Sequence, residues 1–205
     1  MRKHLPTLMV IILLSLPVSV GARSLVNVSL GFGATYSPQE DQAFDLGLQD
    51  PDNWLIGGEI SARLAFIQAQ AMVLPIECGE ASGVLMLGMG SLSIPAIGSL
   101  VAVEVGGGVG VTYVPSSSDS SRSYYELANG TQADASQKSF TDAVLASPMY
   151  LQVGLGSELG PIGVKIRYLM ESQATLGSVM SDNAWWSVFA LKKQSLSLAL
   201  ALKMF

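Results

Sequence analysis

The sequence predicts an all-β protein: an eight-stranded antiparallel up-and-down transmembrane β-barrel with an N-terminal signal peptide. Three observations predict this fold. Apolar and polar residues alternate with a period of two in several segments, the connections between these segments alternate between long and short, and the chain carries little charge. Hydrophobic residues make up 49% of the 205 residues and charged residues only 13%, against about 25% charged in an average soluble domain.

Residues 1–22 are predicted to be a secretory signal peptide. Arg2 and Lys3 precede an uncharged apolar stretch at 8–20, and small residues at 20–22 fit a cleavage site. An anchoring helix is the alternative, but the apolar core is short and no stop-transfer charges follow it. Cleavage leaves 23–205 as one barrel domain, and loss of the two basic residues changes the formal net charge from −5 to −7. This acidity argues against a nucleic-acid partner.

Period-two alternation is the strongest signal in the chain. In 26–36, Leu30 and Phe32 belong to an apolar face, and Ser29 and Thr35 to a polar one. The same pattern recurs in later segments. The predicted strands lie near 24–36, 54–63, 67–76, 83–94, 99–114, 145–158, 162–171 and 195–205, and the strand at 83–94 alternates least clearly.

The connections favour a membrane barrel over a soluble β-sandwich, which would show the same alternation. Predicted loops at 37–53, 77–82, 115–144 and 172–194 are longer than the turns at 64–66, 95–98 and 159–161. Long loops at one rim and tight turns at the other are typical of outer-membrane barrels. We interpret 115–144 as loop because it is rich in serine and alternates little.

Aromatic residues and the chain end agree with this interpretation. Phe32, Tyr36, Trp54 and Tyr113 are expected to face outward towards the long-loop rim, and Phe66 and Phe205 to lie near the short-turn rim, as aromatic girdles. The last strand, 195–205, is expected to pair with the first. An open sheet edge in lipid costs several kcal/mol for each unpaired backbone group, so the barrel must close.

Four features together resemble small eight-stranded bacterial outer-membrane barrels: the signal peptide, the "GGE" at 57–59, the glycine-rich "GGGVG" at 106–110 and the terminal Phe205. The superfamily is that of the OmpA-barrel, OmpW and opacity-type proteins, and the leucine-rich strands resemble those of spirochaete members. The resemblance implies an outer-membrane location and contact with outer-membrane lipid. It also implies recognition by the barrel-assembly machinery through the strand ending at Phe205, although the leucines at 196–202 are out of register with that residue.

The polar strand faces are expected to meet in the lumen. They would bring together three acids and three bases, namely Glu59, Arg63, Glu104, Lys165, Arg167 and Glu171. An eight-stranded barrel is barely wider inside than its own side chains, and a buried ion without a partner is costly. We therefore predict a charge network that plugs the lumen. The alternative is that each charge lies at its own depth and contacts only water.

The sequence offers no catalytic constellation, and we predict that the protein is not an enzyme and binds no cofactor. Its single histidine, His4, lies in the signal peptide, and its single cysteine, Cys78, stands beside two glutamates. Barrel hydrolases and transferases rely on a histidine base. Five acidic residues in the loop 37–53 could bind calcium, but a solvated acidic loop explains them better, so no metal site is predicted.

Two functions fit this chain. The first is a non-catalytic surface protein whose loops contact a host or support the envelope, since exposed loops on rigid scaffolds usually carry binding. The alternative is an OmpW-like conduit for small hydrophobic molecules. In that case Trp185, Trp186 and Phe189 would line an apolar mouth, or would instead lie on the outer leaflet as an interfacial segment.

Overall fold

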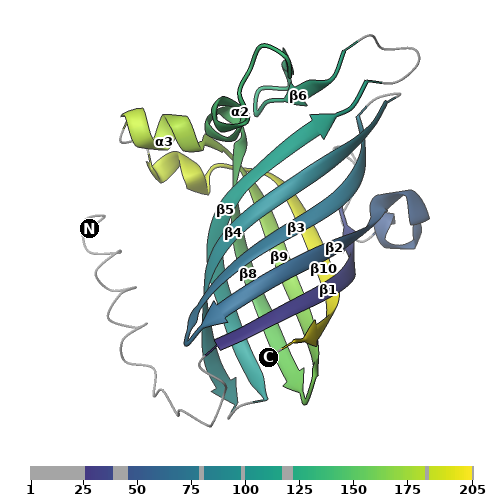
Figure 1. Cartoon of the computed structure of the whole chain (residues 1–205), viewed down its shortest axis with the longest axis vertical. Helices are drawn as coiled ribbons and strands as arrows, with labels where there is room; N and C mark the ends of the chain where they lie inside the picture. The colour runs from purple at the N-terminus through teal and green to yellow at the C-terminus, as the bar shows by residue number, and fades with distance from the viewer. Residues whose placement is uncertain are drawn as a thin grey trace.

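The computed structural model describes residues 26–38, 46–78, 81–97, 100–116, 122–182 and 185–204. The predicted signal peptide and Phe205 lie outside these residues. Eight long strands form a closed barrel (Figure 1). They are β1 (Val26–Tyr36), β2 (Trp54–Leu64), β3 (Ile67–Cys78), β4 (Ala81–Ile97), β5 (Val101–Val114), β8 (Pro148–Leu159), β9 (Ile162–Thr175) and β10 (Leu191–Lys203).

The last strand closes the barrel, as predicted. Every strand pairs antiparallel with its neighbours in the chain, and β10 pairs with β1 from Ser29↔Lys203 to Tyr36↔Leu196. The backbone N–H of Met204 donates to the carbonyl of Val28 at 2.8 Å, which continues this seam past the end of β10. The described wall therefore has no open edge between its first and last strands.

The register of the strands sets the width of the barrel. Following the paired residues once around the wall from Tyr36 leads back to β1 at Val26, a stagger of ten residues. For eight strands this stagger corresponds to a strand tilt of about 40° and a backbone radius of about 8 Å. Such an interior is filled by side chains, with little room for an open channel.

The two rims differ as predicted. At one end, tight turns join β2 to β3 and β8 to β9, where Ala65 (φ 55°) and Gly160 (φ 64°) adopt left-handed conformations. The other end carries nearly all the remaining structure, including α2 (Phe140–Ala146) and α3 (Leu176–Asp182), which lie beyond or outside the wall in Figure 1. The short elements there are η2 (Leu46–Gln49), η3 (Pro51–Asn53), β6 (Tyr124–Glu126), β7 (Gln132–Asp134) and η4 (Trp185–Phe189).

Two loop predictions at this long-loop end were wrong. The loop expected at 77–82 is mostly strand, because β3 and β4 stay paired up to Cys78↔Ala81. Within 115–144, β6 and β7 form a small hairpin that extends β5 through pairs such as Tyr113↔Tyr125. Strands of three residues are too short for alternation to reveal them.

The fourth strand alternates poorly because both of its faces are apolar. Leu85, Leu87 and Met89 point into the barrel, where they join a cluster from other strands. The buried members of that cluster are Met72, Leu74, Leu87, Met89, Tyr150 and Leu169. We call this cluster the apolar layer, and it occupies the long-loop half of the lumen, above the charged residues described below.

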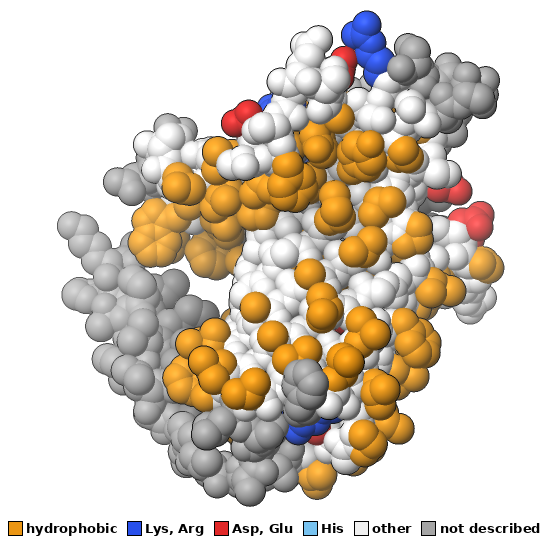
Figure 2. Space-filling model, viewed as in Figure 1, with side chains coloured by type: hydrophobic (Ala, Val, Ile, Leu, Met, Phe, Trp, Pro, Cys, Tyr) orange, Lys and Arg blue, Asp and Glu red, His pale blue; other side chains and the backbone are white. Residues whose placement is uncertain are grey.

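The outer face of the wall carries many hydrophobic side chains, which gather in an upper and a lower band in Figure 2. Among the described strand residues, twenty large hydrophobic side chains are at least 36% exposed, including Phe32 at 64% and Ile60 at 50%. Tyr36 departs from its expected exposed position: it is fully buried and packs on Trp54 with ring centroids 5.4 Å apart. The Trp54 indole donates to the carbonyl of Leu48, so the first loop folds against the wall here. No helix among the described residues is long and apolar enough to cross a membrane.

Candidate functional site: the charged lumen and its mouth

Arg167 lies at the centre of the lumen. Its side chain, from β9, is completely buried and donates two hydrogen bonds to Glu59 on β2, from Nη1 to Oε2 at 2.6 Å and from Nη2 to Oε1 at 3.0 Å. Its Nε lies 3.5 Å from Oε2 of Glu104 on β5. Since β2, β5 and β9 are separated around the wall, this guanidinium bridges the lumen and joins three strands that do not pair.

Lys165 extends the same network towards the short-turn end. Its ammonium donates to Oε1 of Glu59 at 3.1 Å and to the hydroxyl of Ser61 at 2.9 Å. The Ser61 hydroxyl in turn shares a 2.7 Å hydrogen bond with that of Ser29. Glu59 therefore takes charge-assisted hydrogen bonds from two cations, the strong kind in a low-dielectric interior.

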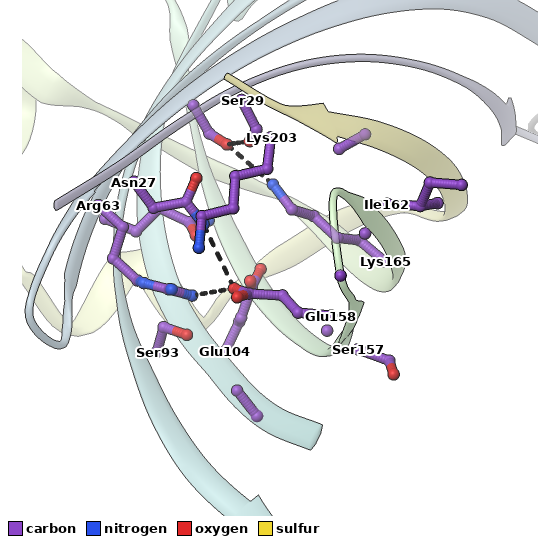
Figure 3. A pocket seen from close by; sticks show the side chains of 17 residues that line it. Asn27, Ser29, Arg63, Ser93, Glu104, Ser157, Glu158, Ile162, Lys165 and Lys203 are labelled. Atoms are coloured by element: carbon purple, nitrogen blue, oxygen red, sulfur yellow. Dashed lines mark hydrogen bonds and ion pairs between the residues drawn. The ribbon is translucent and has the colours of Figure 1, made fainter. Parts of the chain in front are cut away.

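A second ion pair lies nearer the short turns (Figure 3). Arg63 pairs with Glu158 of β8, and the side-chain amide of Asn27 donates to the same carboxylate at 3.5 Å. Lys203 points into the same space (Figure 3). The free volume among these side chains is about 30 Å³, enough for one or two water molecules.

Sequence reasoning missed Glu158 and Lys203. Alternation could have found both, because Gln152, Gly154 and Gly156 share the parity of Glu158, and Ala199 and Ala201 that of Lys203. With them, the inward charges below the apolar layer are three acids and four bases: Glu59, Glu104 and Glu158 against Arg63, Lys165, Arg167 and Lys203. Each buried charge of this set is ion-paired, and this pairing matters because an unpaired buried charge costs several kcal/mol.

Glu171 does not join the ion-pair network. It lies higher on β9, where it accepts a hydrogen bond from the Tyr150 hydroxyl at 3.0 Å. Its cross-strand partner on β10 is Lys193, and among the described residues it has no cation within 4.0 Å. Leu169 lies between Arg167 and Glu171 on the inner face of β9 and belongs to the apolar layer. This layer separates Glu171 from the other charges.

Above the apolar layer the barrel opens into a wide cavity at the long-loop end, which we call the cup. Its volume is about 1030 Å³. Its floor is formed by Leu74, Leu85, Leu87, Tyr150 and Leu169, and its charged lining residues are Asp52, Glu77, Glu126, Glu171, Lys192 and Lys193. Because the apolar layer and the ion pairs fill the lumen below, the cup is a blind cavity.

Trp185, Trp186 and Phe189 lie outside the barrel and do not line the cup. The 3-10 helix η4 that carries them rests on the outer face of β9, where the Ser172 hydroxyl donates to the carbonyl of Ser187 at 3.1 Å. The exposed fractions of the three aromatic side chains are 55%, 58% and 61%. The expectation that these residues line an apolar mouth was therefore wrong.

The described residues hold no group of three His, Cys, Asp or Glu side chains that could bind a metal ion. Of the five acids in the loop 37–53, three lie outside the described residues. Asp50 caps η3 by accepting from the N–H of Asp52 at 3.1 Å. At the tip of the third long loop, hydrogen bonds from Ser136 hold the pKa of the Asp134 carboxyl below its usual value.

No protein-family model matches this sequence, and no curated protein is similar to it. Solved structures are similar in fold. The N-terminal β-barrel domain of OprF from Pseudomonas aeruginosa has a TM-score of 0.50 and 11% sequence identity, over 88% of this chain and 98% of that one. Neisserial surface protein A (NspA) has a TM-score of 0.42 and 10% identity, over 87% and 97% of the two chains. The likeness to the OprF domain shows that this chain has the fold of a small, closed antiparallel β-barrel.

Proposed function

We propose that the protein is a non-catalytic integral outer-membrane barrel with a closed lumen, which presents its long loops at the bacterial cell surface. The observation that carries this proposal is the bridge from Arg167 to Glu59 and Glu104, which crosses the interior where a pore would have to run. A charge bridge of this kind leaves no continuous water path, and the neighbouring free volume of about 30 Å³ is that of one or two waters.

The outer surface supports a membrane location. Soluble monomers rarely expose an apolar patch larger than about 600 Å². Twenty large, substantially exposed hydrophobic side chains spread over the eight strands exceed that limit. Outer-membrane lipid is the partner that would cover them. The ion-paired charges point inward, which is the arrangement of a transmembrane barrel and the reverse of a soluble one.

The long loops carry the surface role. In outer-membrane barrels the long loops face outward and the short turns face the periplasm, which here places β6, β7 and α2 outside the cell. Loops held on a rigid scaffold are common binding sites, so a host molecule or another envelope component is the expected partner. Recognition by the barrel-assembly machinery through the strand ending at Phe205 is part of this proposal.

Planar-bilayer recording on the purified protein tests the closed lumen. We expect no steady ionic conductance from the wild-type barrel. Insertion must be established in the same preparation, by flotation with vesicles and by an unheated gel band that migrates differently from the heated one. Steady conductance from protein that passes both insertion checks would overturn the proposal, because an ion-paired lumen leaves no water column.

The apolar floor of the cup favours a second function, binding of a small hydrophobic molecule as in the OmpW-like alternative. Leu87 lines the cup and Met89 lies in the same apolar layer without lining it. A fluorescent apolar probe should therefore bind the wild type and the Met89→Gln variant, and bind the Leu87→Gln variant more weakly. Equal probe binding by both variants would argue against a site in the cup.

A further inference from the structure

The loop between β9 and β10 presents a compact hydrophobic surface on the outside of the barrel. Its exposed members are Met180 at 72%, Trp185 at 55%, Trp186 at 58% and Phe189 at 61%. We call these four side chains the aromatic shoulder. It serves neither the ion-pair network nor the cup, since none of its residues lines either cavity.

Ring contacts and a hydrogen bond to the wall hold the shoulder in place. Trp185 and Trp186 stack with ring centroids 5.6 Å apart, and Trp186 contacts Phe189 at 6.2 Å. The segment is tied to the wall at its far end, where the N–H of Gln173 donates to the carbonyl of Ala190 at 2.8 Å. Val188 turns the other way from the aromatic rings and is only 8% exposed. The protein thus fixes this segment while leaving its largest apolar side chains uncovered.

The shoulder continues the apolar wall. Two residues after Phe189, β10 begins at the exposed Leu191, and Leu198, Leu200 and Leu202 follow along the outer face of the same strand. In Figure 1, α3 projects sideways from the upper part of the barrel. In the same view, Figure 2 shows hydrophobic side chains at that place, level with the upper hydrophobic band of the wall. Whatever covers the wall therefore reaches the shoulder.

We propose that the aromatic shoulder inserts into the outer-leaflet lipid as an interfacial anchor, with its rings between the headgroups and the acyl chains. Tryptophan is enriched at this depth because its ring is apolar and its indole N–H is polar, and interfacial segments bury their apolar face only about 5–10 Å into the boundary. This inference rests on the proposed function, because it requires the barrel wall to be in the bilayer.

Tryptophan quenching by brominated lipids tests the proposal. The chain has three tryptophans, and Trp54→Phe removes the one outside the shoulder. In phospholipid vesicles, the remaining two should be quenched more by bromine near the acyl-chain carbonyls than by bromine at the bilayer centre, and only weakly by aqueous acrylamide. The reference variant combines Trp54→Phe, Trp185→Phe and Trp186→Phe with Ile60→Trp. It places its single tryptophan in the middle of the wall and should show the opposite depth preference.

The reference separates failure of this inference from failure of the proposed function. If the wall tryptophan is quenched by deep bromine and the shoulder is quenched only by acrylamide, the barrel is in the membrane and the anchor is refuted. If neither the brominated lipids nor aqueous acrylamide quench the shoulder tryptophans, and the protein is dimeric, a second copy covers the shoulder. The anchor is then also refuted. If the wall tryptophan escapes the lipid quencher, both proposals fail.

Discussion

Replacing Arg167 with methionine removes the central cation of the lumen and keeps an unbranched side chain. The structure shows what each partner then loses. Glu59 keeps the ammonium of Lys165 at 3.1 Å. Glu104 keeps only the side-chain amide of Gln152, at 3.5 Å, and is itself 2% exposed. The variant therefore leaves one buried carboxylate without a cation among the described residues.

The expected loss of stability is large. Breaking a buried ion pair by removing one partner costs about 3–5 kcal/mol, because the other charge stays buried without compensation. Since Glu59 retains Lys165, we expect Arg167→Met to lower the free energy of unfolding by about 3 kcal/mol, at the lower end of that range. Native proteins are stable by about 5–15 kcal/mol in total, so the shift should be easy to measure.

A second variant separates the charge from the loss of packing. If the cost comes mainly from the stranded carboxylate, Glu104→Gln combined with Arg167→Met should restore part of the stability lost in Arg167→Met. The coupling energy of such neighbouring residues is typically about 0.5–3 kcal/mol. A purely additive result would mean that the two side chains act independently, which the 3.5 Å contact between them does not allow.

The assay is urea unfolding of the barrel in phospholipid vesicles, followed by tryptophan fluorescence and by the mobility of unheated samples on a gel. Arg122→Met is the matched control: Arg122 is also paired, with Asp134 at 3.3 Å, but its side chain is 74% exposed. Exposed ion pairs contribute little, so the control should unfold as the wild type does. An Arg167→Met variant as stable as this control would refute the assigned role of the network.

Two further predictions concern the wall and the loops. Gly108→Ala should destabilise the barrel by about 1–3 kcal/mol through overpacking, since a Cβ there would lie 2.0 Å from the Gly88 carbonyl oxygen. Gly88→Ala should be tolerated in the same unfolding assay, because its Cβ would meet nothing within 4 Å, and equal effects of the two variants would contradict the described register. Trypsin added to intact cells should cleave after the exposed Arg122, as shown by mass spectrometry of the released peptides, whereas resistance until the cells are lysed would place the long loops inside.

The strands were predictable because each alternates along most of its length. The exception, β4, shows the limit of that signal. Period-two alternation requires the two faces of a strand to differ in polarity, and β4 places Leu87 and Met89 inward while Met86 and Leu92 face out. The apolar layer that causes this brings together residues from four strands, so the sequence of one strand could not reveal it.

The lumen was predicted in outline from the same alternation. Arg167, Glu59, Glu104 and Lys165 face inward and meet there, but the partner of Arg63 was not foreseen. Glu158 is the last residue of the strand predicted at 145–158, and it was not counted among the lumen charges. Parity fixes the face on which a residue lies, whereas the height at which it meets others depends on the stagger of the whole barrel, which only the three-dimensional register provides.

Loop structure was the least predictable part. The aromatic residues of the β9–β10 loop were recognised as a group, but their place inside or outside the mouth depends on the hydrogen bond from Ser172 to Ser187 and on the burial of Val188. Tyr36 was expected on an exposed face and is buried against Trp54. Both outcomes follow from loops that fold back on the outer wall, and strand periodicity carries no information about such packing.

Contacts between methyl groups and lipid test most directly whether the apolar wall faces outward. In lipid nanodiscs, nuclear Overhauser effects should connect acyl-chain protons to the methyl groups of Ile60 and Leu200, which are 50% and 45% exposed. The methyl groups of Leu87 and Leu169, each 2% exposed, should show none. Lipid contacts at Leu87 and Leu169, with bulk water at Ile60 and Leu200, would contradict the account. They would mean that the face of the wall assigned to the lumen faces the lipid and that the ion pairs are not enclosed.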